Sequence, residues 1–124
     1  MTARILIVDD EENLVYFLRQ ALLYRFPNGT VDAAYSGEEG LSWLAVNRYS
    51  LIIADYRMPG FSGLELVKGV RYLDPSTPII LMTAYGSEEL WQQAQGLGVA
   101  RCFSKPFDME EMLAAVGQLV PGSA

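Results

Sequence analysis

Five short apolar runs alternate with five longer segments of helical periodicity along this chain of 124 residues. The runs cover residues 4–8, 30–35, 51–55, 77–82 and 99–103. In the first long segment, apolar residues share one expected helical stripe at Leu14, Phe17, Leu18, Ala21 and Leu22. Strands that alternate with helices in this way predict the α/β class, a doubly wound five-stranded parallel sheet with helices on both faces.

Two capping boxes indicate where helices begin. Ser36 is followed three residues later by Glu39, and Ser62 is followed by Glu65. A serine in this position is the expected N-cap, because its hydroxyl accepts a backbone N–H that the first helical turn leaves unpaired. We therefore expect helices from 36 to about 47, from 62 onward, from about 87 to 97 and from 108 to about 119.

Composition and charge narrow the class of protein. The chain has the length of one domain, and 51% hydrophobic residues suit a sheet that is covered on both faces. A net charge of -6 argues against direct nucleic-acid binding, because phosphate backbones attract basic surfaces. No apolar run approaches the ~20 residues that span a membrane, and the start of the chain lacks the form of a signal peptide. We expect a cytoplasmic protein.

Two residue types are scarce, and their scarcity excludes several kinds of site. Cys102 is the only cysteine, which excludes an internal disulfide and a metal site with several cysteines. Histidine is absent, which excludes a histidine-dependent catalytic triad and a phosphorylated histidine within this chain.

Polar residues follow the predicted strands at their carboxyl ends. Asp9 and Asp10 follow the first strand, Asp55 ends the third, Thr83 follows the fourth, and Lys105 lies just past the fifth. Because ligands of doubly wound folds bind at this edge of the sheet, we expect these side chains to converge there. Taken singly, each has a plainer explanation as a helix cap, a turn residue or a solvated lysine. Together, carboxylates that repel one another in a cleft favour a hard divalent cation with oxygen ligands.

Four sequence blocks at these positions resemble a known family. They are "ILIVDDE", "ADYRMPGFSGLEL", "IILMTAYGS" and "SKPFD", and they extend over nearly the whole chain. In this order and at these separations they resemble the receiver domains of two-component response regulators. The resemblance implies a flavodoxin-like (βα)5 fold with strand order 2-1-3-4-5. It also implies transfer of a phosphoryl group from a sensor histidine kinase or phosphotransfer protein.

The resemblance assigns a role to each residue at the sheet edge. Asp55 is the implied phosphoacceptor, Asp9 and Asp10 are the acidic pair for Mg²⁺, Thr83 is the switch hydroxyl, and Lys105 binds the phosphoryl group. Coordination chemistry agrees, because Mg²⁺ needs only a few protein oxygens and keeps several waters.

The chemistry of these residues indicates which of them contact Mg²⁺ directly and what Lys105 pairs with. Asp10, Asp55 and the backbone carbonyl of Arg57 suffice as direct Mg²⁺ ligands, with Asp9 acting through a water. The Lys105 ammonium can pair with Asp55 before transfer.

One proline and two glycines are expected to shape the loops that follow Asp55 and Lys105. Pro106 permits a cis peptide after Lys105, and the resemblance favours one. Gly60 and Gly63 allow the chain to turn tightly after Asp55.

One position departs from the family pattern. Receivers usually carry Tyr or Phe three residues before the lysine, and here that residue is Cys102. A small buried cysteine cannot act as the moving ring, so the switch is expected to lie in 83–91. By alternation, Phe103 is expected in the core. Trp91 lies beside the expected buried stripe of the fourth helix and is a candidate contact for a downstream effector or output domain, on the face of helix four, strand five and helix five.

Two other functions remain open from the sequence. A phosphatase with an aspartyl-phosphate intermediate usually needs a second aspartate at position 57, where this chain has Arg57. A flavin-binding module would need a phosphate loop rich in Ser, Thr and Gly after the first strand, and none is present. We expect a signalling module, and not an enzyme, with self-catalysed phosphotransfer and autodephosphorylation. Residues 1–120 form the expected receiver domain and 121–124 a tail or artificial end; the resemblance also allows a phosphorylation-dependent homodimer.

Overall fold

A computed structural model describes residues 2–58 and 60–120. The main sheet contains β1 (Arg4–Val8), β2 (Thr30–Ala34), β3 (Leu51–Asp55), β6 (Ile79–Thr83) and β7 (Arg101–Ser104). The helices are α1 (Glu12–Arg25), α2 (Gly37–Val46), α3 (Gly63–Leu73), α4 (Glu88–Gly96) and α5 (Met109–Leu119). Two short strands, β4 (Arg57–Met58) and β5 (Phe61–Ser62), form an antiparallel hairpin after β3.

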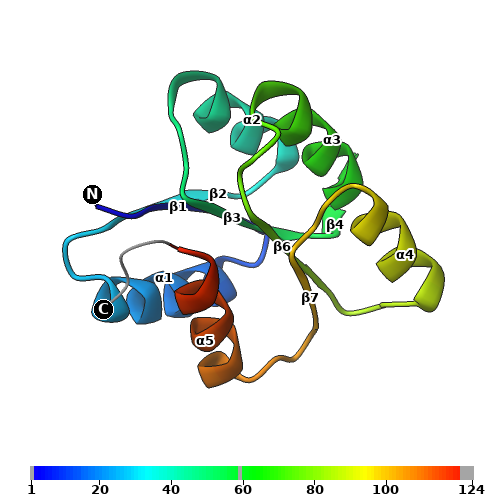
Figure 1. The fold of residues 1–124 in the computed structure, drawn as a ribbon. Coiled ribbons are helices and arrows are strands. Elements are labelled where there is room, and N and C mark those ends of the chain that lie inside the picture. Colours follow the sequence, from blue (N-terminus) through cyan, green and yellow to red (C-terminus); the bar gives the residue numbers. More distant parts are fainter. Residues whose placement is uncertain (1, 59, 121–124) are drawn as a thin grey trace.

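The five strands of the main sheet are parallel and lie in the order β2-β1-β3-β6-β7. Because β4 and β5 stand outside this sheet, the order is the predicted 2-1-3-4-5, and the predicted fold class is confirmed. Figure 1 shows α1 and α5 on one face of the sheet and α2, α3 and α4 on the other. The carboxyl ends of the strands therefore meet at one edge, where the predicted site residues belong.

Alternation along each strand divides the core into two layers. Ile5 and Ile7 of β1 pack with the α1 and α5 side of the core, whereas Leu6 and Val8 pack with the α2, α3 and α4 side. All four are at most 1% exposed. A strand covered on both faces has no polar side, which explains why its sequence is a continuous apolar run.

Local capping chemistry starts four of the five helices. The Ser36 hydroxyl accepts the Glu39 N–H, and the Ser62 hydroxyl accepts the Glu65 N–H, each at 3.1 Å. Both predicted capping sites are confirmed, and α4 and α5 begin in the same way at Ser87 and Asp108. The first helix differs, because the side chain of its N-cap, Glu11, makes no capping hydrogen bond.

The predicted stripe of the first helix is wrong in one member. Phe17 is 63% exposed and packs edge-to-face on Tyr16, with ring centroids 5.4 Å apart. The buried stripe of α1 runs through Val15, Leu18 and Leu22. Phe17 stands about 100° around the helix from Leu18, so it points away from the sheet.

The predicted bounds of the last two sheet strands are shifted by one or two residues. β6 begins at Ile79 and not at 77, and β7 covers 101–104 and not 99–103. Pro78 has no N–H for the ladder, and the Val99 N–H returns to the Ala94 carbonyl at the end of α4. Pro78 therefore has no donor for the ladder and the Val99 N–H is used at the end of α4, so the two strands start later.

Candidate functional site

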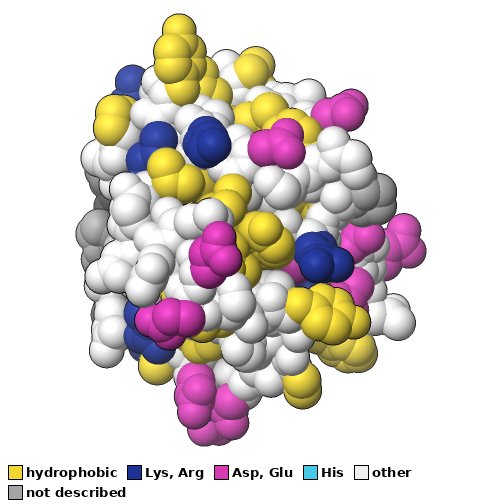
Figure 2. Space-filling view, turned by 90° about the vertical axis from the view of Figure 1, so that its right-hand side faces the viewer, with side chains coloured by type: hydrophobic (Ala, Val, Ile, Leu, Met, Phe, Trp, Pro, Cys, Tyr) yellow, Lys and Arg dark blue, Asp and Glu magenta, His cyan; other side chains and the backbone are white. Residues whose placement is uncertain are grey.

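Four of the predicted site residues lie together at the carboxyl edge of the sheet. Asp9 follows β1, Asp55 ends β3, Thr83 ends β6, and Lys105 follows β7. Asp9 and Thr83 are fully buried, and Asp55 is 6% exposed. Figure 2 faces the right-hand side of Figure 1, toward which the strands run, and shows acidic, basic and apolar side chains intermixed.

The Lys105 ammonium connects three carboxylates. Its Nζ donates to Asp9 Oδ2 and to Glu11 Oε1, each at 2.7 Å, and lies 3.4 Å from Asp55 Oδ2. The predicted pairing of Lys105 with Asp55 is therefore present, but it is the longest of the three ion pairs. The peptide bond between Lys105 and Pro106 is cis, as the resemblance favours.

Burial and charge shift the pKa values of these groups. Burial, reinforced by the nearby Asp9 carboxylate, raises the pKa of Asp55 to about 6, although Lys105 opposes the shift. Burial also raises the pKa of Asp9, against the effect of its hydrogen bond from Lys105. For Lys105, burial lowers the pKa, but the hydrogen bonds to Asp9 and Glu11 outweigh it and raise the pKa overall.

The carboxylate cluster suits a divalent cation. Asp9, Glu11 and Asp55 each offer an oxygen, and these oxygens lie within 4.8 Å of one another. Three carboxylates beside one ammonium leave an excess of negative charge in a largely buried place, which a hard cation such as Mg²⁺ would offset. The donor set present therefore fits the predicted cofactor.

Asp10 and Arg57 lie beside this cluster. Asp10 is exposed and lines an open pocket of about 570 Å³ together with Tyr56 and Arg57. The Arg57 guanidinium lies over the Tyr85 ring, 5.1 Å from its centroid. The roles of Asp10 and of the Arg57 carbonyl as Mg²⁺ ligands stay predictions, because the carboxylates that cluster are those of Asp9, Glu11 and Asp55.

The turn after Asp55 depends on glycine. Gly60 has a φ of +69°, a conformation that favours glycine. At Gly63, a Cβ would lie 2.6 Å from the Asp55 carbonyl oxygen and 2.7 Å from Tyr56 Cα. The tight turn expected at these glycines is confirmed, and α3 begins at Gly63, directly after the turn.

Thr83 is held by the loop that follows it. Its Oγ1 accepts the Tyr85 N–H at 3.1 Å, and its carbonyl accepts the Lys105 N–H at 2.8 Å. Thr83 therefore holds both the loop that follows β6, through its hydroxyl, and the backbone of Lys105, through its carbonyl.

Cys102 and Phe103 lie on opposite faces of β7. Cys102 is half-buried and packs on the side of α3 and α4, and burial raises the pKa of its thiol. Phe103 lies in the opposite core layer and meets Phe107 edge-to-face, with ring centroids 6.1 Å apart. The prediction that Phe103 belongs to the core is confirmed. Trp91 is half-buried, and its ring covers Gly86.

Glu11 is the site residue that the sequence did not identify. It follows Asp10 in "VDDE" and is the third acid of that run. Its ion pair joins residues 94 positions apart in the chain, so no local pattern reports it.

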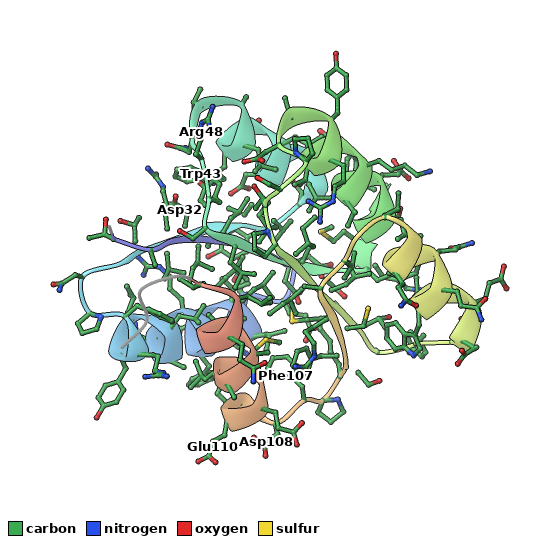
Figure 3. The ribbon with its side chains drawn as sticks, in the orientation of Figure 1. Asp32, Trp43, Arg48, Phe107, Asp108 and Glu110 are labelled. Atoms are coloured by element: carbon green, nitrogen blue, oxygen red, sulfur yellow. The ribbon has the colours of Figure 1, made fainter. Side chains whose placement is uncertain are left out.

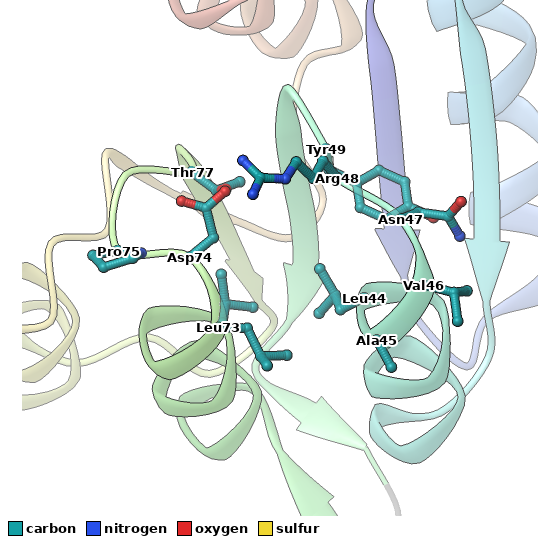
Figure 4. A pocket seen from close by; sticks show the side chains of 11 residues that line it. Leu44, Ala45, Val46, Asn47, Arg48, Tyr49, Leu73, Asp74, Pro75 and Thr77 are labelled. Carbon is teal, nitrogen blue, oxygen red and sulfur yellow. The ribbon is translucent and has the colours of Figure 1, made fainter.

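A second groove lies away from the carboxylates. It has a volume of about 550 Å³ and lies between the C-terminal parts of α2 and α3. Figure 4 shows the Arg48 and Asp74 side chains pointing toward one another at its edge. In Figure 3, Arg48 lies with Asp32 and Trp43 on one side of the sheet, and Phe107 and Asp108 lie on the other. None of the predicted site residues lines this groove.

Comparisons with known proteins agree on one family. The model of the response regulator receiver domain family matches residues 5–117. The response regulator ArlR of Staphylococcus aureus is 40% identical over 115 residues, which cover 91% of this chain and 50% of ArlR. The chain thus spans about half the length of the curated relatives it matches.

Two solved structures extend the likeness to three dimensions. Chemotaxis response regulator CheY4 of Vibrio cholerae has a TM-score of 0.86 at 30% identity, covering 97% of this chain and 100% of that chain. A CheY-like receiver domain protein from Methanospirillum hungatei has a TM-score of 0.89 at 26% identity, covering 95% and 93% of the two chains.

Every helix within 2–58 and 60–120 is too short or too polar to cross a lipid bilayer.

With its sheet order, its edge of clustered carboxylates and a family match over 5–117, the chain belongs to the receiver domains of response regulators, signalling modules of two-component systems.

Proposed function

We propose that this receiver accepts a phosphoryl group on Asp55 from a sensor histidine kinase or a phosphotransfer protein. The observation that carries the proposal is the position of Asp55. Its carboxylate ends β3 among two other acids, with the Lys105 ammonium 3.4 Å away. Asp55 is also the only one of the three carboxylates that a strand of the sheet itself carries at its last residue.

The transfer is a displacement at phosphorus. An Asp55 carboxylate oxygen forms a P–O bond while the P–N bond of the donor phosphohistidine breaks. The electron pair of that bond goes to the imidazole nitrogen, which then takes a proton. In this chain, Asp55 is the nucleophile and Lys105 pairs with a phosphoryl oxygen. Hydrolysis by water later breaks the acyl phosphate, which is the proposed autodephosphorylation.

Mg²⁺ is the proposed cofactor, held by Asp9, Asp10, Asp55 and the carbonyl of Arg57. When bound, it would offset the charge of the carboxylates and of the phosphoryl oxygens. The support for it is the acidic cluster, whose charge the single ammonium of Lys105 does not balance.

The proposed consequence of phosphorylation is a change of binding surface. Thr83 is drawn toward the phosphoryl oxygens, and the 83–91 segment follows. Trp91 on α4 is the proposed contact for an effector or output domain, and a phosphorylation-dependent homodimer would use the same α4, β7 and α5 face. Residues 1–120 are the proposed domain, and the 121–124 tail lies outside the described residues.

Acetyl phosphate with Mg²⁺ tests the chemistry directly. Intact-mass measurement should show one added phosphoryl group that is stable in acid and labile in base. Asp55→Ala should abolish the labelling. Asp74→Asn, at the far end of α3, is the matched control and should label like the wild type. Equal labelling of wild type and Asp55→Ala would show that the phosphoacceptor is a different residue.

A further inference from the structure

The Lys105 ammonium lies closer to two neighbouring acids than to the proposed phosphoacceptor. Its distances are 2.7 Å to Asp9, 2.7 Å to Glu11 and 3.4 Å to Asp55. The Lys105 side chain is 11% exposed, whereas that of Glu11 is 61% exposed. Glu11 therefore reaches the ammonium from the solvent side, and Asp9 meets it from the protein interior.

The backbone of Glu11 is fixed by the same cluster. Its N–H donates to Asp9 Oδ1 at 2.9 Å, while Asp9 Oδ2 accepts from Lys105. Glu11 is the N-cap of α1, but its side chain caps no backbone group of the helix. That side chain is engaged by the ammonium of Lys105, which is its hydrogen-bond partner.

The two short contacts of the ammonium differ in how easily they break. Asp9 is buried and bonded through both carboxylate oxygens, so it cannot move without losing both bonds. Glu11 is exposed, so water can replace the ammonium around its carboxylate at little free-energy cost. The backbone N–H of Lys105 is bonded to the Thr83 carbonyl, so rotation of the Lys105 side chain can move the ammonium while this backbone bond stays in place.

We propose that Glu11 is a positioning residue, which holds the Lys105 ammonium back from Asp55 until a phosphoryl group arrives. It thereby limits the rate at which the receiver is phosphorylated. The inference rests on the proposed function of Asp55 and Lys105. Glu11 acts through Lys105 and touches neither the phosphoryl donor nor the attacking oxygen.

Glu11→Gln is the first test, because it keeps the shape of the side chain and removes its charge. At saturating Mg²⁺, the initial rate of labelling by acetyl phosphate should rise about 2- to 5-fold, the size expected for breaking a partly exposed ion pair. In the protein without Mg²⁺ or donor, the ¹H–¹⁵N signal of the Lys105 ammonium should shift. This second readout reports the contact itself and requires no phosphorylation.

Glu12→Gln is the matched control. Glu12 lies in the first turn of α1, is exposed, and is not among the acids that bind Lys105. Glu12→Gln removes the same charge one residue away. Its labelling rate therefore measures how the loss of a nearby negative charge affects the reaction with an anionic donor. In a Lys105→Met background, Glu11→Gln should then change the rate no more than Glu12→Gln does, because the residue through which Glu11 acts is gone.

The outcomes separate the two proposals. The positioning role is supported if Glu11→Gln raises the labelling rate, Glu12→Gln leaves the rate unchanged, and Glu11→Gln has no extra effect on the rate in the Lys105→Met background. Equal rates for Glu11→Gln and Glu12→Gln, or an unmoved Lys105 ammonium signal, overturn it while leaving Asp55 as phosphoacceptor. A wild type that is not labelled on Asp55 overturns the proposed function, and the rate limit with it.

Discussion

Neutralising Asp55 should stabilise this domain at neutral pH. The carboxylate is 6% exposed, and its pKa is raised from 3.8 to about 6 by burial and by the charge of Asp9. A raised pKa means that folding disfavours the ionised form. Above pH 7, the free energy of unfolding of Asp55→Asn should therefore exceed that of the wild type by ~2 to 3 kcal/mol, at about 1.4 kcal/mol for each pKa unit.

The pH dependence of this difference has a defined sign. Below about pH 4, Asp55 is protonated in both the folded and the unfolded chain, so the two proteins should be nearly equally stable. As the pH rises from about 4 through about 6, the wild type loses the stability that its protonated carboxyl provided, and Asp55→Asn does not. Lys105 keeps both of its short contacts, to Asp9 and Glu11, in the variant.

Urea unfolding with EDTA present, followed by tryptophan fluorescence from pH 4 to pH 8, measures this difference. Trp43 and Trp91 are both half-buried and serve as probes. Asp10→Asn is the control, because it removes an exposed charge next to the cluster and should change stability by less than ~0.5 kcal/mol. A variant no more stable than wild type at pH 7.5, or a difference that does not change with pH, would refute the reasoning.

Three further predictions follow from the structure. Asp10→Ala should weaken Mg²⁺ binding at least about tenfold in a fluorescence titration, and a titration equal to wild type would exclude the ligand role. A beryllofluoride phosphate mimic should shift amide signals of 83–91 strongly and of Cys102 weakly, with Thr83→Ala reducing the response; the reverse pattern would place the switch on β7. The Arg71 guanidinium donates to the carbonyls of Leu97, Thr77 and Gly98 at 2.7 to 2.9 Å. Arg71→Met should therefore lower the free energy of unfolding, measured in urea, by about 2 kcal/mol. A decrease of less than ~0.5 kcal/mol would show that water replaces these bonds.

The parts of the fold that the sequence predicts well depend on local or uniform signals. β1 and β3 have the predicted bounds, because each is apolar along its whole length and covered on both faces. The starts of α2 and α3 are correct because a serine and a glutamate three residues apart are sufficient to cap a helix. In both cases the sequence signal and the interaction it predicts lie within a few residues.

The errors arise where distant parts of the chain decide the outcome. Phe17 is apolar, but the angle at which α1 packs on the sheet selects Val15 and Leu18 as the buried residues. The β4 and β5 hairpin has two residues in each strand, too few to show an alternating pattern. Glu11 is an exposed acid at the start of a helix, and its part in the site depends on Lys105, which arrives from β7.

The placement of Glu11 also bears on the charge balance of the proposed reaction. Before transfer, three carboxylates face one ammonium, and a divalent cation would bring the cluster close to neutral. Phosphorylation replaces the single charge of Asp55 with the charge of about −2 on a phosphoryl group, so the cluster gains about one negative charge. Asp9 cannot respond, because it is fully buried and bonded through both oxygens. In the proposed role, Glu11 would turn into water and release the ammonium to the phosphoryl group, and this one movement would relieve the added repulsion.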